Sequence, residues 1–205
     1  MRNFNFDTVS HNGDSTTAAA PYPYLDTVLL HSFLPTGRET LEAWRAMELF
    51  VPHRIRQLGI CNVSLTQLHA LCNSVRIKPA VVQNRFYQKS NYDCDVREFC
   101  RENNIRYQAY WVLKKNHHLL DSDLVQELVR ERGVSREAAL FFLIQRGLGV
   151  AILDGTTSVE HMRGNIADLE KLTSWAAETT NGERLAWLGR EFERSLGDME
   201  FLQGQ

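Results

Sequence analysis

The chain has few cysteines, little proline and no excess of charge of either sign. Only 4 Cys and 5 Pro occur in 205 residues, and 25 acidic against 23 basic residues give a formal net charge of -2. The cysteines show neither a CxxC pair nor the spacing of a zinc site, so we expect free thiols and no metal centre. A nearly neutral chain has no field that attracts a phosphate backbone, which argues against a nucleic-acid partner.

Long apolar runs are absent as well. No run approaches the roughly 20 residues that cross a bilayer, and residues 1–20 lack the basic and then apolar order of a secretion signal. We therefore expect a cytoplasmic protein without a membrane partner. HExxH, GxSxG and P-loop motifs are missing too, so zinc protease, serine hydrolase and kinase chemistry have no support. The composition that remains, with 43% hydrophobic and 23% charged residues, is typical of a globular domain.

Three segments differ in pattern. Residues 1–23 are polar, and we interpret them as a mobile leader. Residues 24–170 alternate short apolar runs with stretches of helical spacing, which is typical of βα units around a parallel sheet. Residues 171–205 form an amphipathic helical tail. Five units of this length match five-eighths of an eight-stranded barrel, for which roughly 250 residues are usual. The sequence thus predicts an α/β fold, a partial (β/α)8 TIM barrel followed by a C-terminal helix.

The apolar runs cover residues 25–31, 56–62, 79–84, 105–113 and 149–153, and we expect each to form a strand. Ser64, with Gln67 three positions on, predicts the capped start of a helix. Gly133 and Gly147 predict the C-terminal ends of helices over 122–132 and 135–146.

Two further sets of apolar residues recur at helical spacing and predict faces packed on the core. One helix starts at Ser158, and the other lies in the tail. The sets are Val159, Met162, Ile166 and Leu169 in the first, and Leu185, Leu188, Phe192 and Leu196 in the second.

Polar and aromatic residues end several of the expected strands, where parallel α/β proteins bind their ligands. The amides of Asn62 and Gln83 can make two-sided hydrogen bonds to a planar carboxamide, and Tyr110 or Trp111 can stack on a flat ring. His31 can donate into the same pocket. Each residue also has a plainer interpretation: a core histidine for His31, loop caps for the amides, and core packing for the aromatics.

The stretch Gly155-Thr156-Thr157-Ser158 leads into a helix with small residues and hydroxyls. Exposed N–H groups at a helix N-terminus can hold a phosphate. A plain capped turn is the alternative.

Taken together and in order, these runs resemble the aldo-keto reductase family of oxidoreductases, in a fungal and plant-like branch. The resemblance spans about residues 24–170. It rests on residues 24–26 with His31, 57–64 (QLGICNVS), 79–84 (PAVVQN), 108–111 (QAYW) and 155–158 (GTTS) with His161, Met162 and Asn165. It implies an eight-stranded barrel that binds NADPH and reduces a small carbonyl substrate, an aldehyde or a ketone, to an alcohol.

The resemblance also implies a role for each matching residue. His31 corresponds to the histidine that orients the carbonyl, and Tyr110 to the residue that stacks on the nicotinamide. The cofactor carboxamide would lie at Cys61, Asn62 and Gln83, and the adenosine end with its 2'-phosphate at Gly155, Thr156, Thr157, His161 and Asn165. The family usually carries a lysine at the Gly155 position and an arginine at the His161 position. NADH is therefore the alternative cofactor.

One part of the family pattern has no counterpart here. The catalytic aspartate, tyrosine and lysine of the family come from its first three βα units, whereas the runs of this chain correspond to strands 4 to 8. Residues 1–23 do not supply those three groups in that arrangement, so we interpret the chain as N-terminally truncated. A non-catalytic nucleotide-binding or protein-interaction role is the alternative function, and the open barrel edge would favour self-association.

Overall fold

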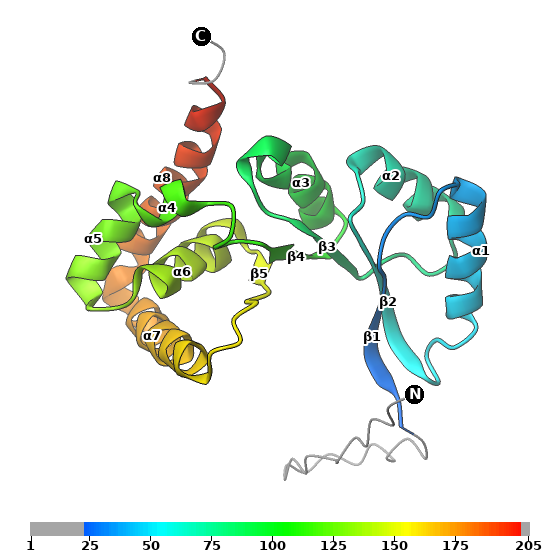
Figure 1. Ribbon diagram of the computed structural model, residues 1–205, viewed down its shortest axis with the longest axis horizontal. Helices are drawn as coiled ribbons and strands as arrows, with labels where there is room; N and C mark the ends of the chain where they lie inside the picture. The colour runs from blue at the N-terminus through cyan, green and yellow to red at the C-terminus, as the bar shows by residue number, and fades with distance from the viewer. Residues whose placement is uncertain (1–22, 202–205) are drawn as a thin grey trace.

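The computed structural model describes residues 23–201, and the predicted α/β architecture is confirmed over that range. Five parallel strands form one sheet in the order β1-β2-β3-β4-β5. They are β1 (Leu25–Leu30), β2 (Ile55–Cys61), β3 (Val81–Arg85), β4 (Arg106–Tyr110) and β5 (Ala151–Ile152). The sheet does not close, so β1 and β5 are its two edges and the barrel is partial (Figure 1).

Helices follow each strand, as in successive βα units. They are α1 (Gly37–Glu48), α2 (Leu65–Ser74), α3 (Cys94–Glu102), α4 (His117–Leu120), α5 (Asp123–Arg132), α6 (Arg136–Leu148), α7 (Val159–Ala177) and α8 (Gly182–Phe201), with short 3-10 segments η1 (Gln88–Asp93) and η2 (Thr179–Asn181). Figure 1 shows α4 to α8 gathered on the β5 side and α1 to α3 beside β1 to β4. No helix within residues 23–201 has the length and apolar character needed to cross a bilayer.

Gly59 lies on β2, between β1 and β3. It faces Leu29 of β1 on one side and Val81 of β3 on the other. A Cβ at Gly59 would lie 2.3 Å from Leu29 Cδ2 and 2.6 Å from the Val81 carbonyl oxygen. The first half of the sheet therefore depends on the absence of a side chain at this position.

The helix starts are as predicted, whereas one predicted helix end is wrong. Ser64 and Gln67 form a reciprocal capping box, and Gly133, with a φ of 60°, ends α5. Helix α6 does not end at Gly147. It continues to Leu148, and Gly149, with a φ of 67°, takes the left-handed position.

Gly147 has a packing role instead. A Cβ at Gly147 would lie 3.3 Å from the Cα of Gly189 on α8, so the two glycines let α6 and α8 cross closely. The predicted tail helix is confirmed as α8. Its apolar residues Leu188, Phe192 and Leu196 are buried.

Two predicted strands are too long. The run 105–113 gives a strand only as far as Tyr110, because Trp111 adopts a φ of 65° and the chain turns there. The run 149–153 contributes only Ala151 and Ile152, which pair with β4.

The predicted core face of α7 is wrong over its first half. Val159 and Ile166 are each 57% exposed and Met162 is 40% exposed. Only further along the helix are apolar residues covered, with Leu172 and Trp175 buried. The sheet stops at β5, and no further strand of residues 23–201 covers these side chains. The expected boundary at 170/171 lies inside α7, and the expected leader falls almost wholly outside the described residues.

Candidate functional site

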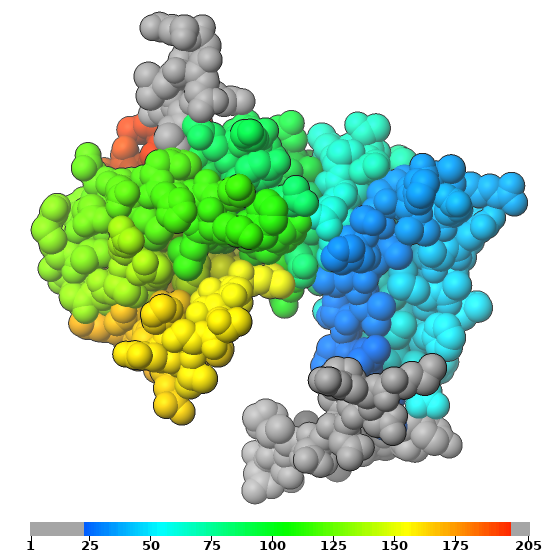
Figure 2. Space-filling model, in the orientation of Figure 1, coloured from blue at the N-terminus to red at the C-terminus, as the bar shows by residue number. Residues whose placement is uncertain are grey.

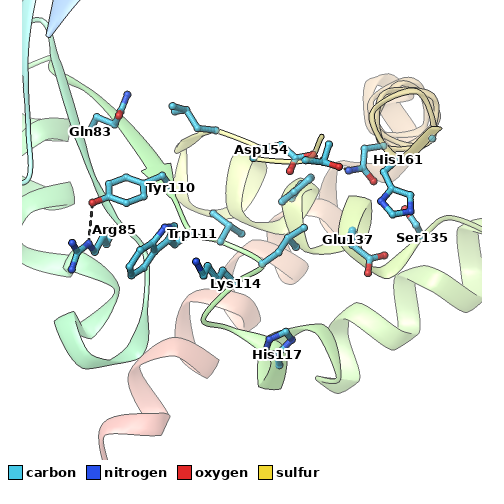
Figure 3. Close-up of a pocket in the computed structure, with 18 of the residues that line it drawn as sticks. Gln83, Arg85, Tyr110, Trp111, Lys114, His117, Ser135, Glu137, Asp154 and His161 are labelled. Atoms are coloured by element: carbon cyan, nitrogen blue, oxygen red, sulfur yellow. Dashed lines mark hydrogen bonds between the residues drawn. The ribbon is translucent and has the colours of Figure 1, made fainter. Parts of the chain in front are cut away.

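A cavity of about 1190 Å³ lies at the carboxyl ends of the strands. Eight of the ten residues predicted for the site line it: His31, Asn62, Gln83, Tyr110, Gly155, Thr156, His161 and Asn165. They come from β1 to β4 on one side and from the β5–α7 segment on the other. Figure 2 shows the molecule hollowed between β1 and the segment that runs from β5 into α7, and Figure 3 shows the cavity wall.

A chain of hydrogen bonds crosses the strand ends on the β1–β4 side. Asn62 Nδ2 donates to the His31 carbonyl oxygen at 2.8 Å. The Tyr110 hydroxyl donates to Asn62 Oδ1, and Arg85 Nε donates to the Tyr110 oxygen at 3.0 Å (Figure 3). Side chains from the ends of β2, β3 and β4 and the backbone carbonyl of His31 after β1 are therefore held in one connected layer that faces the cavity.

A left-handed backbone conformation sets the direction of the chain at two residues on the β1–β4 side of the cavity. Asn62 has a φ of 54° and Trp111 a φ of 65°, each directly after a strand. Asparagine tolerates the left-handed region because its short side chain bonds locally, whereas an aromatic residue there is unusual. The turn at Trp111 also ends β4 and brings the indole to the cavity wall.

Gln83 lies on the cavity wall, while Cys61 lies behind it. Gln83 Nε2 donates to Gln108 Oε1 at 2.9 Å, and the Cys61 thiol donates to Gln83 Oε1 across 3.7 Å. Cys61 is buried and is not part of the cavity lining. Burial raises the pKa of the Cys61 thiol. The structure therefore places Cys61 beside Gln83, where its thiol supports the Gln83 amide.

A cluster of buried polar side chains holds the loop that follows β2 in place. Asn84 bonds both backbone groups of Val63, accepting from its N–H at 3.0 Å and donating to its carbonyl at 2.7 Å. Asn84 Nδ2 and the Tyr107 hydroxyl both donate to Asp93 Oδ2, at 2.6 and 2.9 Å. Burial raises the pKa of Asp93, and the two hydrogen bonds oppose that shift. This cluster fixes the position of the residue next to Asn62.

The other end of the cavity is built on the start of α7. Ser158 caps the helix by accepting from the His161 N–H at 3.2 Å, and Thr156 Oγ1 accepts from the Ser158 N–H at 3.1 Å. Asn165 donates to Asp154 at 3.0 Å. Thr157 is exposed and does not line the cavity.

Acidic side chains predominate at this end. Asp154, Glu160, Glu137 and Asp168 all line the cavity. In Figure 3, Asp154, Glu137 and His161 lie across the cavity from Arg85 and Tyr110.

Sequence reasoning missed several lining residues, among them Arg85, Lys114, Glu137 and Asp168. Arg85 ends β3 two positions after Gln83, so the period of two along a strand was a usable signal for it. Glu137 and Asp168 come from helices, and no strand-end pattern marks them. Across residues 23–201, no three metal-ligating side chains gather into a metal site.

The sequence resembles known reductases. Residues 21–175 match the model of the aldo/keto reductase family. An NADPH-dependent alpha-keto amide reductase of Saccharomyces cerevisiae is 28% identical, over 83% of this chain and 57% of its own length. A 9,11-endoperoxide prostaglandin H2 reductase of Trypanosoma cruzi is 26% identical, over 61% of this chain and 44% of its own. The chain thus spans about half the length of these curated relatives.

Solved structures share the fold. An aldo/keto reductase from Brucella melitensis superimposes with a TM-score of 0.63 at 19% identity, covering 80% of this chain and 61% of that one. An aldo-keto reductase of the silkworm Bombyx mori, solved with NADPH, has a TM-score of 0.58 at 18% identity, covering 80% and 54%. The likeness of fold agrees with the match to the family model, which covers most of the sequence. This chain belongs to the aldo/keto reductase family.

Proposed function

We propose that the cavity binds a nicotinamide dinucleotide, and that the chain takes part in the NADPH-dependent reduction of an aldehyde or ketone. One observation carries the proposal. A single cavity brings His31, Asn62, Gln83 and Tyr110 together opposite the N-terminus of α7. The names of the relatives, an NADPH-dependent reductase and a protein solved with NADPH, support the same cofactor.

The residues on the cavity wall fit the nicotinamide end of such a ligand. A side-chain amide has two N–H donors and two acceptor lone pairs. In Asn62 and in Gln83, one N–H is used within the protein. Each amide therefore keeps a second N–H with which to hold a carboxamide, and the Tyr110 ring offers a flat surface for stacking.

Reduction of a carbonyl requires a hydride at carbon, which a bound dihydronicotinamide would supply, and a proton at oxygen, which would come from water that reaches the open site. His31 is the residue of this chain that we propose to bind the carbonyl oxygen. It directly follows β1, it lines the cavity, and its own carbonyl is fixed by Asn62. A hydrogen bond from its imidazole would polarise the carbonyl and orient it.

At the adenosine end of the cavity, the charges of the nearby side chains affect whether NADPH or NADH binds more tightly. The N–H groups at the start of α7 favour an anion there. Asp154 and Glu160 oppose a second phosphate, and His161 is the only basic side chain in this part of the lining within the described residues. NADPH is the proposal because of the relatives, and NADH is the alternative.

A second function, nucleotide binding without turnover, is favoured by the open sheet. β1, which His31 follows, pairs with β2 on one side and has no neighbouring strand on its other side among residues 23–201. A carbonyl bound at His31 would then lack a wall on that side, and water would have access to it.

A titration combined with a turnover assay separates the two functions. NADPH should quench the emission of Trp111, and a panel of small aldehydes should consume NADPH. His31→Ala should leave NADPH binding within about twofold of the wild type and lower turnover about 10²-fold or more. Trp187→Phe is the control for fluorescence from outside the cavity. Binding without turnover would support the second function, and the absence of binding would contradict both.

A further inference from the structure

The ladder between β2 and β3 ends at Cys61, and a side chain holds the backbone beyond it. Asn84 of β3 accepts from the Val63 N–H at 3.0 Å and donates to the Val63 carbonyl at 2.7 Å. One amide, which is 5% exposed, therefore binds both backbone groups of Val63. The Asn62 N–H donates to the Gln83 carbonyl at 3.1 Å. Thus β3 holds the backbone at Asn62 and at the residue that follows it.

A carboxylate determines the orientation of the Asn84 amide. The amide nitrogen has two N–H groups, of which one donates to the Val63 carbonyl and the other to Asp93 Oδ2 at 2.6 Å. If the amide were turned over, its oxygen would face the carboxylate, which only accepts hydrogen bonds. The bonds to both backbone groups of Val63 would then be lost. Asp93 therefore selects the orientation in which Asn84 fits Val63.

The segment that carries Asp93 adopts an uncommon backbone conformation. Asn91, Tyr92 and Asp93 follow one another with φ values of 48°, 49° and 58°, in the left-handed region that residues other than glycine enter at a cost. The Tyr92 N–H donates to the Tyr87 carbonyl at 3.0 Å, and the Tyr92 carbonyl accepts from Arg97 Nε at 2.9 Å. Strained backbone of this kind clusters at functional sites. Here the strained conformation brings a carboxylate to the buried amide of β3.

We propose that Asp93 and Asn84 are positioning residues, which hold the Asn62 amide in the geometry that binds the carboxamide of a nicotinamide. They act through Val63, whose fixed backbone keeps Asn62 in its left-handed conformation, with a φ of 54°. Neither Asp93 nor Asn84 lines the cavity, so neither contacts the ligand itself. This inference rests on the proposed function, because it concerns how the same ligand is held.

Two cofactors that differ only at the carboxamide test the proposal. NADP+ carries the carboxamide, whereas its 3-acetylpyridine analogue carries a methyl ketone, which keeps the oxygen and has no N–H. The adenosine end and the diphosphate are the same in both, so the ratio of the two affinities reports the contacts of the carboxamide. Calorimetric titration of the whole chain measures both affinities. The wild type should bind NADP+ about fivefold more tightly than the analogue, as one neutral hydrogen bond contributes.

Substitutions at Asp93 should change this ratio in a defined order. Asp93→Ala removes the group that orients Asn84 and should lower the ratio to about one, chiefly by weakening the binding of NADP+. Asp93→Asn keeps an oxygen that can accept from Asn84 and should retain the ratio of the wild type. Tyr107→Phe removes one of the two hydrogen bonds to Asp93 Oδ2, and it should about halve the ratio even where Asp93→Ala does not fold. Leu128→Ala, which truncates a fully buried side chain of α5 outside the cavity, is the control for lost stability and should leave the ratio unchanged.

The outcomes separate this inference from the proposed function. An unchanged ratio in Asp93→Ala and Tyr107→Phe would overturn the inference and leave the proposed function standing. Weakening of both cofactors by the same factor would also overturn it, since Asp93 would then have only a structural role. Equal affinity of the wild type for the two cofactors would overturn it without contradicting nucleotide binding. A wild type that binds neither cofactor would disprove the proposed function and the inference together.

Discussion

At the residue scale, the side chains that face the cavity are held by neighbours that no local pattern reveals. Asn62 and Gln83 were predictable because each ends an apolar run. Their bonds to His31 and Gln108 depend on which strands lie side by side. Cys61 shows the limit most clearly. Its place in the run suggested a ligand contact, whereas its neighbour in the structure is Gln83, the residue that faces it in the register of β2 and β3.

The buried carboxyl of Asp93 makes stability depend on pH. Burial raises the pKa of Asp93 in the folded chain, so the folded state binds more protons than the unfolded state above about pH 4. Stability is therefore lost as the pH rises through that window. Asp93→Asn removes the titration and keeps an oxygen that can accept from Asn84 and Tyr107, since both bonds end on Oδ2.

We expect Asp93→Asn to gain stability relative to the wild type as the pH rises from about 4 to about 7. Urea unfolding at several pH values measures the difference in free energy of unfolding. Glu102→Gln, which removes an exposed carboxylate at the end of α3, is the control. A constant difference between Asp93→Asn and the wild type would contradict the account of Asp93.

The cofactor preference should respond to one added cation. A Cβ at Gly155 would meet nothing within 4 Å, so Gly155→Lys places an ammonium at the start of α7 without a steric cost. The ratio of NADPH to NADH affinity should rise about fivefold to tenfold, as a new charge-assisted contact to a phosphate would produce. Gly37→Lys, at an equally open position on α1, should leave the ratio unchanged. Calorimetric titrations with both nucleotides give the ratio, and an unaltered ratio in Gly155→Lys would place the 2'-phosphate elsewhere.

At the element scale, helix starts were predictable and helix ends were less so. Ser64 and Gln67 specify a start within four residues. Gly147 and Gly149 are both reasonable ends for α6, and in the structure Gly147 stays helical and packs against Gly189 of a helix some forty residues further along. The end of β4 likewise depends on the turn at Trp111, which an apolar run through residue 113 conceals.

The packing of β2 against its neighbours gives a direct test of the sheet. Gly59→Ala would force a methyl group against Leu29 and the Val81 carbonyl. Overpacking of this kind typically costs about 1–3 kcal/mol, and we expect the upper end because one of the atoms is backbone. Thermal and urea unfolding measure the loss, with Gly155→Ala as a control in open space. Stability equal to the wild type in Gly59→Ala would mean that β1, β2 and β3 are further apart than described.

At the scale of the whole molecule, the repeat of strand and helix was enough to predict a partial barrel. Five apolar runs with helical spacing between them gave the number and direction of the strands. The same pattern gave a wrong prediction of burial for the first half of α7. The spacing of apolar residues shows that a helix has an apolar face, but it does not show whether another element covers that face. Val159, Met162 and Ile166 are exposed on a helix beside the open edge at β5.

This exposed face leads us to propose self-association of the chain. Complete burial of an exposed Ile or Val side chain contributes about 1.5–3 kcal/mol, so a contact through Val159 and Ile166 would supply part of the free energy of association. Sedimentation velocity should show a concentration-dependent dimer or larger species. Ile166→Glu should weaken association about tenfold or more, whereas Arg163→Glu, a charge change on the same helix, should have a smaller effect. A monomer at every concentration would exclude this contact.

The account depends above all on nucleotide binding in the cavity between the strand ends and α7. Calorimetric titration of the whole chain with NADPH tests it most directly when the wild type is compared with Tyr110→Ala and Asn62→Ala. The account predicts one site per chain, about tenfold weaker binding in each variant, and wild-type binding in the control Trp187→Phe. No heat of binding in the wild type, or equal binding in all four proteins, would contradict it.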